Sequence, residues 1–447
     1  MGVTIFNLIQ SSSIIATDLA ITNTPHHVVW MNEVLGCGNE ILPVLSARST
    51  FNAKKVSAKN PLHNPLFACY FSLGIRGITL GPLHSSILMQ DGSVWSTGYN
   101  YFGQLGSVPA SVRTTFDVTI SSGVQAVSAG YMHSMVLKQD GSVWTSGRNT
   151  WGELGDGSRS NRYEFVKVIS GGVKAVRAGY GHSMALKQDG SLWATGANYL
   201  GQLGDGTTHE RRNFVKVMLD GAKTMDASDV HSCVVKKDGS LWATGWNFFG
   251  TLGDGSNLDR HSFVRVISSG VKAAAVGSYH TLALKENGSV WGAGYNGQGQ
   301  LGNGKFDSNR FVQIVSADAK AIASGNGISF VLKQDGSLWG TGYNKEGELG
   351  DGSHSDKSHF IEVISSGVKA VVAGHRHTYV VKQDDSVWGA GCNEWGQLGD
   401  GSTTRRLRFV RVIQASNSAL VDVISGIRFC IATARSFARA CLHSLFV

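Results

Sequence analysis

The feature that most constrains the fold of this chain is a tryptophan that returns at an almost constant interval. Seven Trp residues follow one another at spacings of 49, 49, 49, 49, 48 and 49 residues, namely Trp95, Trp144, Trp193, Trp242, Trp291, Trp339 and Trp388. A period of this length is typical of propellers and solenoids, in which each unit buries its apolar face against its neighbour. The chain is therefore expected to repeat one structural unit.

Each copy contains four short apolar runs, which in the third copy read "VKAVRAG", "HSMALKQDG", "SLWATG" and "FVKVM". The runs are rich in Val, Leu and Trp, alternate in polarity and lack a helical period, as strands do. Four short strands per unit make the sheet of one propeller blade. The sequence therefore predicts an all-β fold, a beta-propeller of seven four-stranded blades over residues 75–413.

The turn between the second and third runs is an Asp-Gly or Asn-Gly pair in six copies. Such pairs favour a two-residue type I′ hairpin, which needs positive φ at both central positions. The seventh copy has Asp384-Asp385 instead. Asp385 is therefore expected in a left-handed conformation, at a cost of about 1 kcal/mol relative to Gly.

The two ends of the chain depart from the repeat, over residues 1–74 and 414–447. Residues 421–426 and 429–434 resemble the first two strands of a further unit, and Trp30 precedes Phe51 by the Trp-to-Phe distance of six copies. The ends are expected to supply complementary halves of an eighth blade, because an open ring would leave a bare sheet edge. Seven blades remain the primary prediction and eight the alternative. Residues 57–73 are apolar and unlike their surroundings, and their place in the protein stays open.

Charge and cysteine content limit the class of protein. The net charge of +8 and the pI near 9.1 permit acidic partners without requiring them. The six Cys form no C-x-x-C pair, which argues against a zinc ribbon or a disulfide framework and for a reducing compartment. No secretory signal pattern begins the chain, and no run reaches the roughly 18 apolar residues of a membrane helix. We expect an intracellular monomer, cytoplasmic or nuclear, with no membrane partner.

The consensus of the copies is G-x-x-H-[ST]-x-x-L-K-x-D-G-S-[VL]-W-x-x-G-x-N-x-x-G-[QE]-L-G-D-G. It resembles the repeat of the regulator of chromosome condensation family, including its tubulin-suppressor-like members, over residues 75–413. The resemblance implies a propeller fold. The family includes exchange factors for the small GTPase Ran, accessory domains of ubiquitin ligases and interaction modules, so the resemblance implies binding without choosing a partner.

A histidine returns at the start of the second run in six copies and is replaced by Ile328 in the sixth copy. The set is His84, His133, His182, His231, His280 and His377. Histidines of neighbouring blades are too far apart to share one ion at ligand distances of about 2 Å, so a structural hydrogen bond is favoured over a metal site. For the repeated Trp, core packing between blades is favoured.

The candidates for catalysis are weak. The Gly-rich loop has Gln, Glu or Thr where a phosphate-binding loop needs Lys. The hairpin motif is similar to the Asp-box of sialidase-type propellers, but the Trp comes one residue early and every copy carries the motif. Glycosidase chemistry needs a singular pair of catalytic groups. We expect no enzyme, no catalytic residue, no metal and no cofactor, with a glycosidase-type propeller as the least favoured function.

A basic residue stands three positions before the fourth-strand Phe in six copies, with Arg310 nearby in the fifth. These candidate partner-binding residues are Arg113, Arg162, Arg211, Arg260, Lys357 and Arg406. Equivalent positions lie on one face of a ring, so they would form a basic crown for an acidic partner. The favoured alternative is an ion pair within each copy to the Asp of the G-D-G motif, at Asp156, Asp205, Asp254, Asp351 or Asp400.

The function that these patterns favour is a non-enzymatic scaffold that binds a protein partner through the loops of one face, where the residues that vary between copies stand on a rigid frame. The alternative is a guanine nucleotide exchange factor for a small GTPase. The resemblance implies a wedge-like insertion for that activity, and the even spacing leaves no room for one inside the ring. The expected partner is an acidic protein or a small GTPase rather than nucleic acid.

Overall fold

The computed structural model describes residues 74–107, 112–304 and 306–413, together with three short strands near the amino terminus. It divides into two units, Met1–Tyr70 and Phe71–Val447. In the first unit, β1 (Val3–Thr4), β2 (Thr17–Ile21) and β3 (Val29–Asn32) form a three-stranded antiparallel sheet.

The second unit is a ring of seven blades, each an antiparallel sheet of four strands that pair in sequence order. Blade 1 contains β4 (Ile75–Leu80), β5 (His84–Met89), β6 (Val94–Tyr99) and β7 (Val112–Ile120). Blade 2 contains β8 (Val124–Ala129), β9 (His133–Lys138), β10 (Val143–Gly147) and β11 (Arg162–Ile169). Blade 3 contains β12 (Val173–Ala178), β13 (His182–Lys187), β14 (Leu192–Gly196) and β15 (Arg211–Met218). Blade 4 contains β16 (Ala222–Ala227), β17 (His231–Lys236), β18 (Leu241–Gly245) and β19 (Arg260–Ile267).

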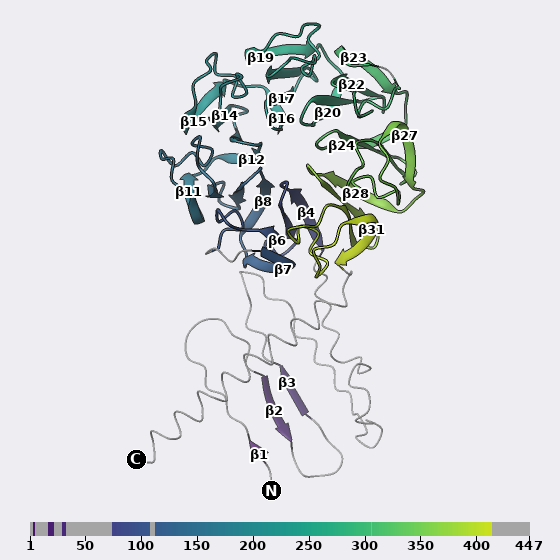
Figure 1. Ribbon diagram of the computed structural model, residues 1–447. Coiled ribbons are helices and arrows are strands. Elements are labelled where there is room, and N and C mark those ends of the chain that lie inside the picture. Colours follow the sequence, from purple (N-terminus) through teal and green to yellow (C-terminus); the bar gives the residue numbers. More distant parts are fainter. Residues whose placement is uncertain are drawn as a thin grey trace. The chain divides into compact units, whose positions relative to one another are not determined.

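Blade 5 contains β20 (Val271–Val276), β21 (His280–Lys285), β22 (Val290–Gly294) and β23 (Ser308–Val315). Blade 6 contains β24 (Ala319–Ser324), β25 (Ile328–Lys333), β26 (Leu338–Gly342) and β27 (Lys357–Ile364). Blade 7 contains β28 (Val368–Ala373), β29 (His377–Lys382), β30 (Val387–Gly391) and β31 (Arg406–Ile413). The first strand of each blade lies at the centre of the ring and the fourth at its rim (Figure 1). The predicted seven-bladed, all-β propeller is confirmed. None of the residues described forms a helix, so none provides an apolar helix of membrane-spanning length.

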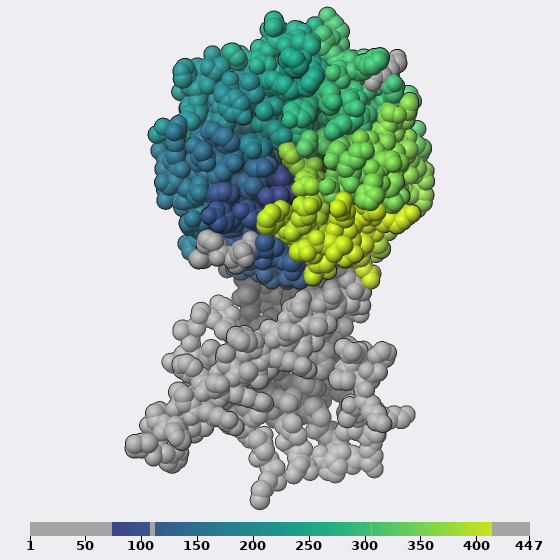
Figure 2. All heavy atoms as spheres, in the orientation of Figure 1, coloured from purple at the N-terminus to yellow at the C-terminus, as the bar shows by residue number. Residues whose placement is uncertain are grey.

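The ring is closed by direct contact between blade 7 and blade 1. The Ser85 hydroxyl lies 2.8 Å from Nε2 of His377 and donates to the carbonyl of Gln397 at 2.7 Å. Ile87 of blade 1 packs in one apolar cluster with Tyr379 and Leu398 of blade 7. Atoms of the first and last blades touch in Figure 2, where they are purple-blue and yellow. Of the two blade numbers that the sequence left open, the structure has seven.

Most of the residues predicted to form an eighth blade fall outside the described part of the chain. Trp30 lies in β3 of the first unit. Phe51, residues 421–426 and 429–434, and the apolar stretch 57–73 lie outside the described residues. Pairing between the chain ends stays a prediction.

The apolar core lies between blades rather than within them. Met135 and Leu137 of blade 2 pack with Val173 of blade 3, and Trp193 of blade 3 covers this cluster. The Trp193 indole donates to Ser191, and the ammonium of Lys187 lies 4.1 Å from the ring centroid. The predicted packing between blades is confirmed for Trp95, Trp144, Trp193 and Trp291, which pack against such clusters.

The turn that joins the second and third strands differs from the predicted one. In blade 2, Gly141 donates its N–H to the carbonyl of Lys138, and Lys138 donates to the carbonyl of Ser142. These bonds enclose three residues, and only Gly141 has positive φ, whereas Asp140 accepts a bond from the N–H of Ser142. The prediction of a two-residue type I′ turn was wrong. A tight turn followed by a left-handed Gly is the usual three-residue alternative, and the Asp carboxylate stabilises it by bonding two residues ahead.

The repeated His residues join neighbouring blades through a buried relay of two hydrogen bonds. Nε2 of His133 lies 2.9 Å from the hydroxyl of Ser183 in the next blade, and that hydroxyl donates to the carbonyl of Glu153 at 2.7 Å. The other His–hydroxyl pairs are His84–Ser134, His182–Ser232, His231–Thr281, His280–Ser329 and His377–Ser85, at 2.8–3.1 Å. The predicted hydrogen-bonding role of these histidines is confirmed.

The sixth copy shows what the relay contributes. Because Ile328 replaces His, the buried hydroxyl of Thr378 finds no hydrogen-bond partner among the described residues. Thr281 occupies the equivalent position in blade 5 and bonds both His231 and the carbonyl of Thr251. Thr281 and Thr378 thus occupy equivalent positions, one with the relay and one without it, and can be compared directly.

We predict that Thr281→Val and Thr378→Val have different effects on stability. Thr281→Val leaves two buried polar groups unpaired and should lower the free energy of unfolding by about 1–3 kcal/mol. Thr378→Val removes a hydroxyl without a partner and should leave stability equal or higher. Urea unfolding of both variants measures the difference, and equal losses would contradict the relay.

The relay also predicts a pH dependence of stability. Burial lowers the pKa of His182 from 6.5 to about 4, and that of His133 to about 3, so the folded imidazoles are neutral. The unfolded chain binds protons below pH 6.5 while the folded chain does not, so the free energy of unfolding should fall as the pH decreases from 6.5 to about 4. Thermal melts across this range measure the slope. His182→Gln should make the slope shallower, and an unchanged slope would refute the assignment.

The left-handed residue in the seventh hairpin carries a further prediction. Asp385 has φ 61°, as expected, and pairs with Lys369. Asp385→Gly should raise the free energy of unfolding by about 0.5–1 kcal/mol, because Gly adopts this conformation without strain. Asp385→Asn is the control, since it also removes the exposed ion pair. If Asp385→Gly were no more stable than Asp385→Asn in urea unfolding, backbone strain would be excluded.

Candidate partner-binding face

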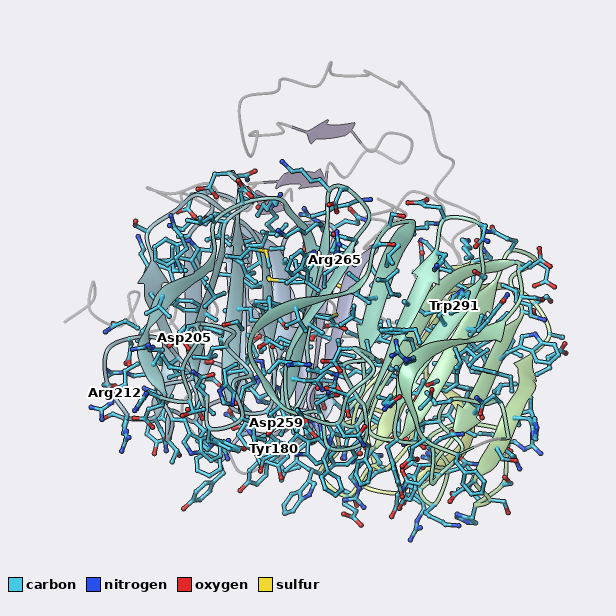
Figure 3. The ribbon with its side chains drawn as sticks, turned by 90° about the horizontal axis from the view of Figure 1, so that it is seen from above. Tyr180, Asp205, Arg212, Asp259, Arg265 and Trp291 are labelled. Atoms are coloured by element: carbon cyan, nitrogen blue, oxygen red, sulfur yellow. The ribbon has the colours of Figure 1, made fainter. Side chains whose placement is uncertain are left out.

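The ring has two faces built from different connections. Because successive strands run in opposite directions, the connections after the first and third strands of every blade emerge on one side, which we call the loop face. The hairpins between the second and third strands and the connections between blades emerge on the other, the hairpin face. In the side view of Figure 3, Tyr180 and Asp259 lie at the lower edge, on the loop face, and Arg265 lies towards the opposite edge.

The repeated residues of the third connection organise its backbone. In blade 3, Oδ1 of Asn198 accepts from the N–H of Leu203 at 3.0 Å, and its amide donates to Asp205 at 2.9 Å. Gln202 accepts from the N–H of Leu200 at 3.0 Å. Equivalent Asn bonds recur in the other blades, for example at Asn247. The motif G-x-N-x-x-G is therefore a rigid scaffold, and its three varied positions are free to carry a surface.

These varied positions are rich in aromatic residues. The set on the third connections is Tyr99, Tyr101, Phe102, Trp151, Tyr199, Trp246, Phe248, Phe249, Tyr295, Tyr343 and Trp395, and Tyr131, Tyr180 and Tyr279 join it from the first connections. We call this set the aromatic band. Tyr101, Phe248 and Tyr199 expose 63%, 61% and 54% of their surface. Monomeric proteins rarely expose so many large apolar side chains together without a binding role.

Part of the band lines a depression of about 760 Å³ on the loop face. Trp246 and Phe249 of blade 4 lie beside Tyr279 and Tyr295 of blade 5, with ring centroids 5.3 Å apart for Trp246–Tyr279 and 4.7 Å apart for Phe249–Tyr295. The remaining lining residues are Leu200, Val230, Gln298, Asn326, Tyr343, His375 and Arg376. An apolar wall with a few polar groups is the usual character of a binding pocket.

An ion pair joins opposite sides of the ring beside this depression. Nε2 of His375 in blade 7 lies 2.6 Å from Oδ1 of Asp229 in blade 4. Burial favours the neutral forms of both groups, but their mutual attraction prevails, so the pKa of Asp229 is lowered and that of His375 is raised. Asp229 thus stays ionised and His375 protonated, at the point where the loop face meets the channel along the axis of the ring.

A second polar centre lies within the aromatic band on blades 2 and 3. The guanidinium of Arg148 lies 4.4 Å from the ring of Trp151 and 5.4 Å from that of Tyr180, and its Nε donates to Glu153 at 3.1 Å. Burial raises the pKa of Glu153, and the charge of Arg148 opposes this. Arginine stacked among aromatic rings is a common composition of protein-binding hot spots.

The basic residues predicted from the sequence lie at the start of the outermost strands. Five of them form the predicted ion pair within their copy: Arg162–Asp156 at 2.7 Å, Arg211–Asp205 at 2.7 Å, Arg260–Asp254 at 2.6 Å, Lys357–Asp351 at 3.1 Å and Arg406–Asp400 at 2.6 Å. Arg113 instead donates to Ser107, which replaces the Asp, and lies 3.7 Å from Asp117. The ion-pair interpretation is confirmed, and a role of these residues in partner binding stays a prediction.

The sequence reasoning missed the aromatic band, although it placed the site on the varied positions of one face. The signal was present in the residues that flank the Asn of G-x-N-x-x-G, as in "GYNYFG" and "GWNFFG". In the part of the chain that the structure describes, no group of three or more His, Cys, Asp or Glu side chains is placed to hold a metal ion.

Comparisons with known proteins agree with this architecture. The RCC1-like domain model matches residues 166–438. Models of the regulator of chromosome condensation (RCC1) repeat match residues 91–137 and 140–186, and residues 124–152. No curated protein sequence matches the chain.

Solved structures share the fold at low sequence identity. Human WBSCR16 has a TM-score of 0.64 at 19% identity, covering 72% of this chain and 93% of its own. Prp20p from Saccharomyces cerevisiae, described with its binding properties to Gsp1p and histones, has a TM-score of 0.65 at 20% identity, covering 74% and 87%. Yeast RCC1 (Prp20) bound to Kap60 has a TM-score of 0.66 at 19% identity, covering 84% and 92%. With seven copies of the repeat folded into seven blades, this chain belongs to the regulator of chromosome condensation (RCC1) repeat family.

Proposed function

We propose that this protein is a propeller scaffold that binds a protein partner through its loop face. The observation that carries the proposal is the aromatic band, which exposes several rings on one face and lines part of a depression there. Tyr, Trp and Arg are the residues most enriched in the energetic centres of protein interfaces. The varied positions of the repeat supply all three types here.

The frame beneath the band suits tight binding. In blades 2, 3, 4, 6 and 7 the third connection is held by its Asn and by the carboxylate of the G-D-G motif. A surface that is ordered before binding loses little conformational entropy when the partner arrives. The two polar centres, Asp229–His375 and Arg148–Glu153, would then select the orientation of the partner.

Guanine nucleotide exchange on a small GTPase is the more specific alternative function. Among the proteins of similar fold, Prp20p is the one described with binding to Gsp1p. In this chain the described blades repeat without an added segment between strands that could act as a wedge. A nucleotide-release assay against a panel of small GTPases tests this activity, and acceleration of about tenfold with one of them would establish exchange over scaffolding.

The aromatic band generates a direct test. The triple variant Tyr101→Ala, Tyr199→Ala, Phe248→Ala removes exposed rings and should lower partner affinity at least about a hundredfold, or about 3 kcal/mol, with an unchanged thermal midpoint. Leu219→Ala, which is 79% exposed on the hairpin face, is the control and should bind normally. Quantitative affinity capture from source cells identifies the partner and measures both variants. Undiminished capture by the triple variant would reject the loop face.

The basic residues at the rim generate a separate test. Arg162→Gln, Arg211→Gln, Arg260→Gln should lower the free energy of unfolding by about 1–2 kcal/mol in total, because each Arg is partly exposed and its pair is screened. Capture that becomes weaker and less sensitive to salt would assign them to the partner surface as well. Unaltered capture together with the lower stability would restrict them to the frame.

A further inference from the structure

The hairpin face carries a repeated feature that the proposed function does not use. In every blade the first strand pairs with the second through a β-bulge, at its second residue. The bulged residues are Arg76, Gln125, Lys174, Lys223, Lys272, Lys320 and Lys369. Six of the seven positions are cationic. A bulge leaves one residue outside the ladder and re-aims its side chain, so it is a structural device rather than a defect.

The fold places these seven positions around the axis of the ring. The first strands are the innermost ones, and each lies within 8 Å of the next at Cα around the whole ring. The bulged residues stand at the end of the strand next to the hairpins, as the pairing of Lys369 with Asp385 of its own hairpin shows. The cations therefore encircle one mouth of the central channel, and we call them the basic ring. The channel itself is lined by later residues of the same strands, such as Val127, Thr224 and Ile322, and has a volume of about 450 Å³.

Most of the basic ring is not neutralised locally. Among the described residues, Lys369 is the member with an ion pair, whereas Lys223, Lys272 and Lys320 are exposed and have none. The first Asp of six hairpins accepts a hydrogen bond from the N–H of the Ser two residues on. Asp140 accepts two hydrogen bonds from Ser142, which lower its pKa together with the charges of Lys167 and Lys138 on its own blade. Among the described residues, the ammonium groups of Lys223, Lys272 and Lys320 therefore carry positive charge around the axis that no ion pair compensates.

We propose that the basic ring binds a compact polyphosphorylated ligand of the inositol polyphosphate class, free or as the headgroup of a phosphoinositide. Lysine is a flexible point charge that suits phosphate groups presented in several directions. A closed ring around an axis fits a compact polyanion, whereas nucleic acid presents its phosphates along a line and needs a stripe of charge. The exposed rings of the aromatic band, on which single-stranded nucleic acid could stack, lie on the opposite face.

The test uses the full chain, isothermal titration calorimetry and inositol hexakisphosphate as the probe. The wild-type protein should bind it, with an affinity that falls as NaCl is raised. The triple variant Lys223→Gln, Lys272→Gln, Lys320→Gln should lose at least about tenfold in affinity while keeping its thermal midpoint, because these side chains have no partner to lose. The matched control is Lys167→Gln, Lys216→Gln, Arg265→Gln, which removes three charges from outer strands and should bind within about twofold of wild type.

Absence of binding by the wild-type protein, or equal losses in the two triple variants, would overturn the proposal. A short DNA duplex that binds more tightly than inositol hexakisphosphate through the same three lysines would also overturn it. Flotation with phosphatidylcholine vesicles that contain phosphatidylinositol bisphosphate distinguishes a free inositol polyphosphate from the headgroup of a phosphoinositide. Recruitment that the inner triple variant abolishes assigns the ligand to a lipid headgroup, and calorimetric binding without recruitment assigns it to the free polyphosphate.

Discussion

The hydrogen-bond relay between blades is the interaction on which the rest of the structure depends. Apolar contacts hold neighbouring blades together, but they are weakly directional and would tolerate several relative positions. The relay, in contrast, has a defined geometry. It joins the neutral imidazole of one blade to a hydroxyl of the next blade, and that hydroxyl donates to a carbonyl in the third connection of the blade that carries the imidazole. An unpaired member would be costly in this buried setting, so the His–hydroxyl bond sets the relative position of the two blades at six of the seven blade interfaces. Between blades 6 and 7, where Ile328 replaces the His, apolar contacts such as Ile328 with Val380 hold the blades.

The same relay connects the core to the loop face. The carbonyl that accepts from the Ser or Thr hydroxyl belongs to the third connection, as Gln202 does for Ser232. That connection is also held by its Asn and by the G-D-G carboxylate. The polar groups of the repeated residues thus hold the backbone of the frame. The aromatic band consists of residues at the varied positions, whose side chains the frame does not require. This division explains how a chain of near-identical copies can present a surface that differs from blade to blade.

The two faces of the ring have different chemistry for a similar reason. The loop face combines aromatic rings with compensated ion pairs such as Asp229–His375 and Arg376–Glu346. The hairpin face exposes lysines at bulges that every copy repeats. A partner that relies on apolar contact and one that relies on charge would therefore meet opposite sides of the same molecule, and the rigid frame would hold both sites at once.

Much of the fold could be predicted from local residue patterns. The nearly constant spacing of Trp predicted the blades, and the repeated His, replaced once by Ile328, predicted a structural hydrogen bond. The Arg or Lys that stands three residues before the fourth-strand Phe in six copies predicted an ion pair, which five copies form. The turn was mispredicted because Asp140 bonds to Ser142 and leaves the positive φ to Gly141 alone. That outcome depends on a side-chain bond that competes with the intrinsic preference of the dipeptide.

The sequence by itself determined the repeating unit, its four strands and the separation of frame residues from varied ones, because these follow from periodicity within 49 residues. Only the tertiary structure decided what closes the ring and what meets on each face. Ser85 and His377 are 292 residues apart, and Asp229 and His375 are 146 apart, yet both pairs are in hydrogen-bond contact. No single copy determines such contacts. They depend on the rotation from each blade to the next, which adds up over seven blades until the last blade meets the first.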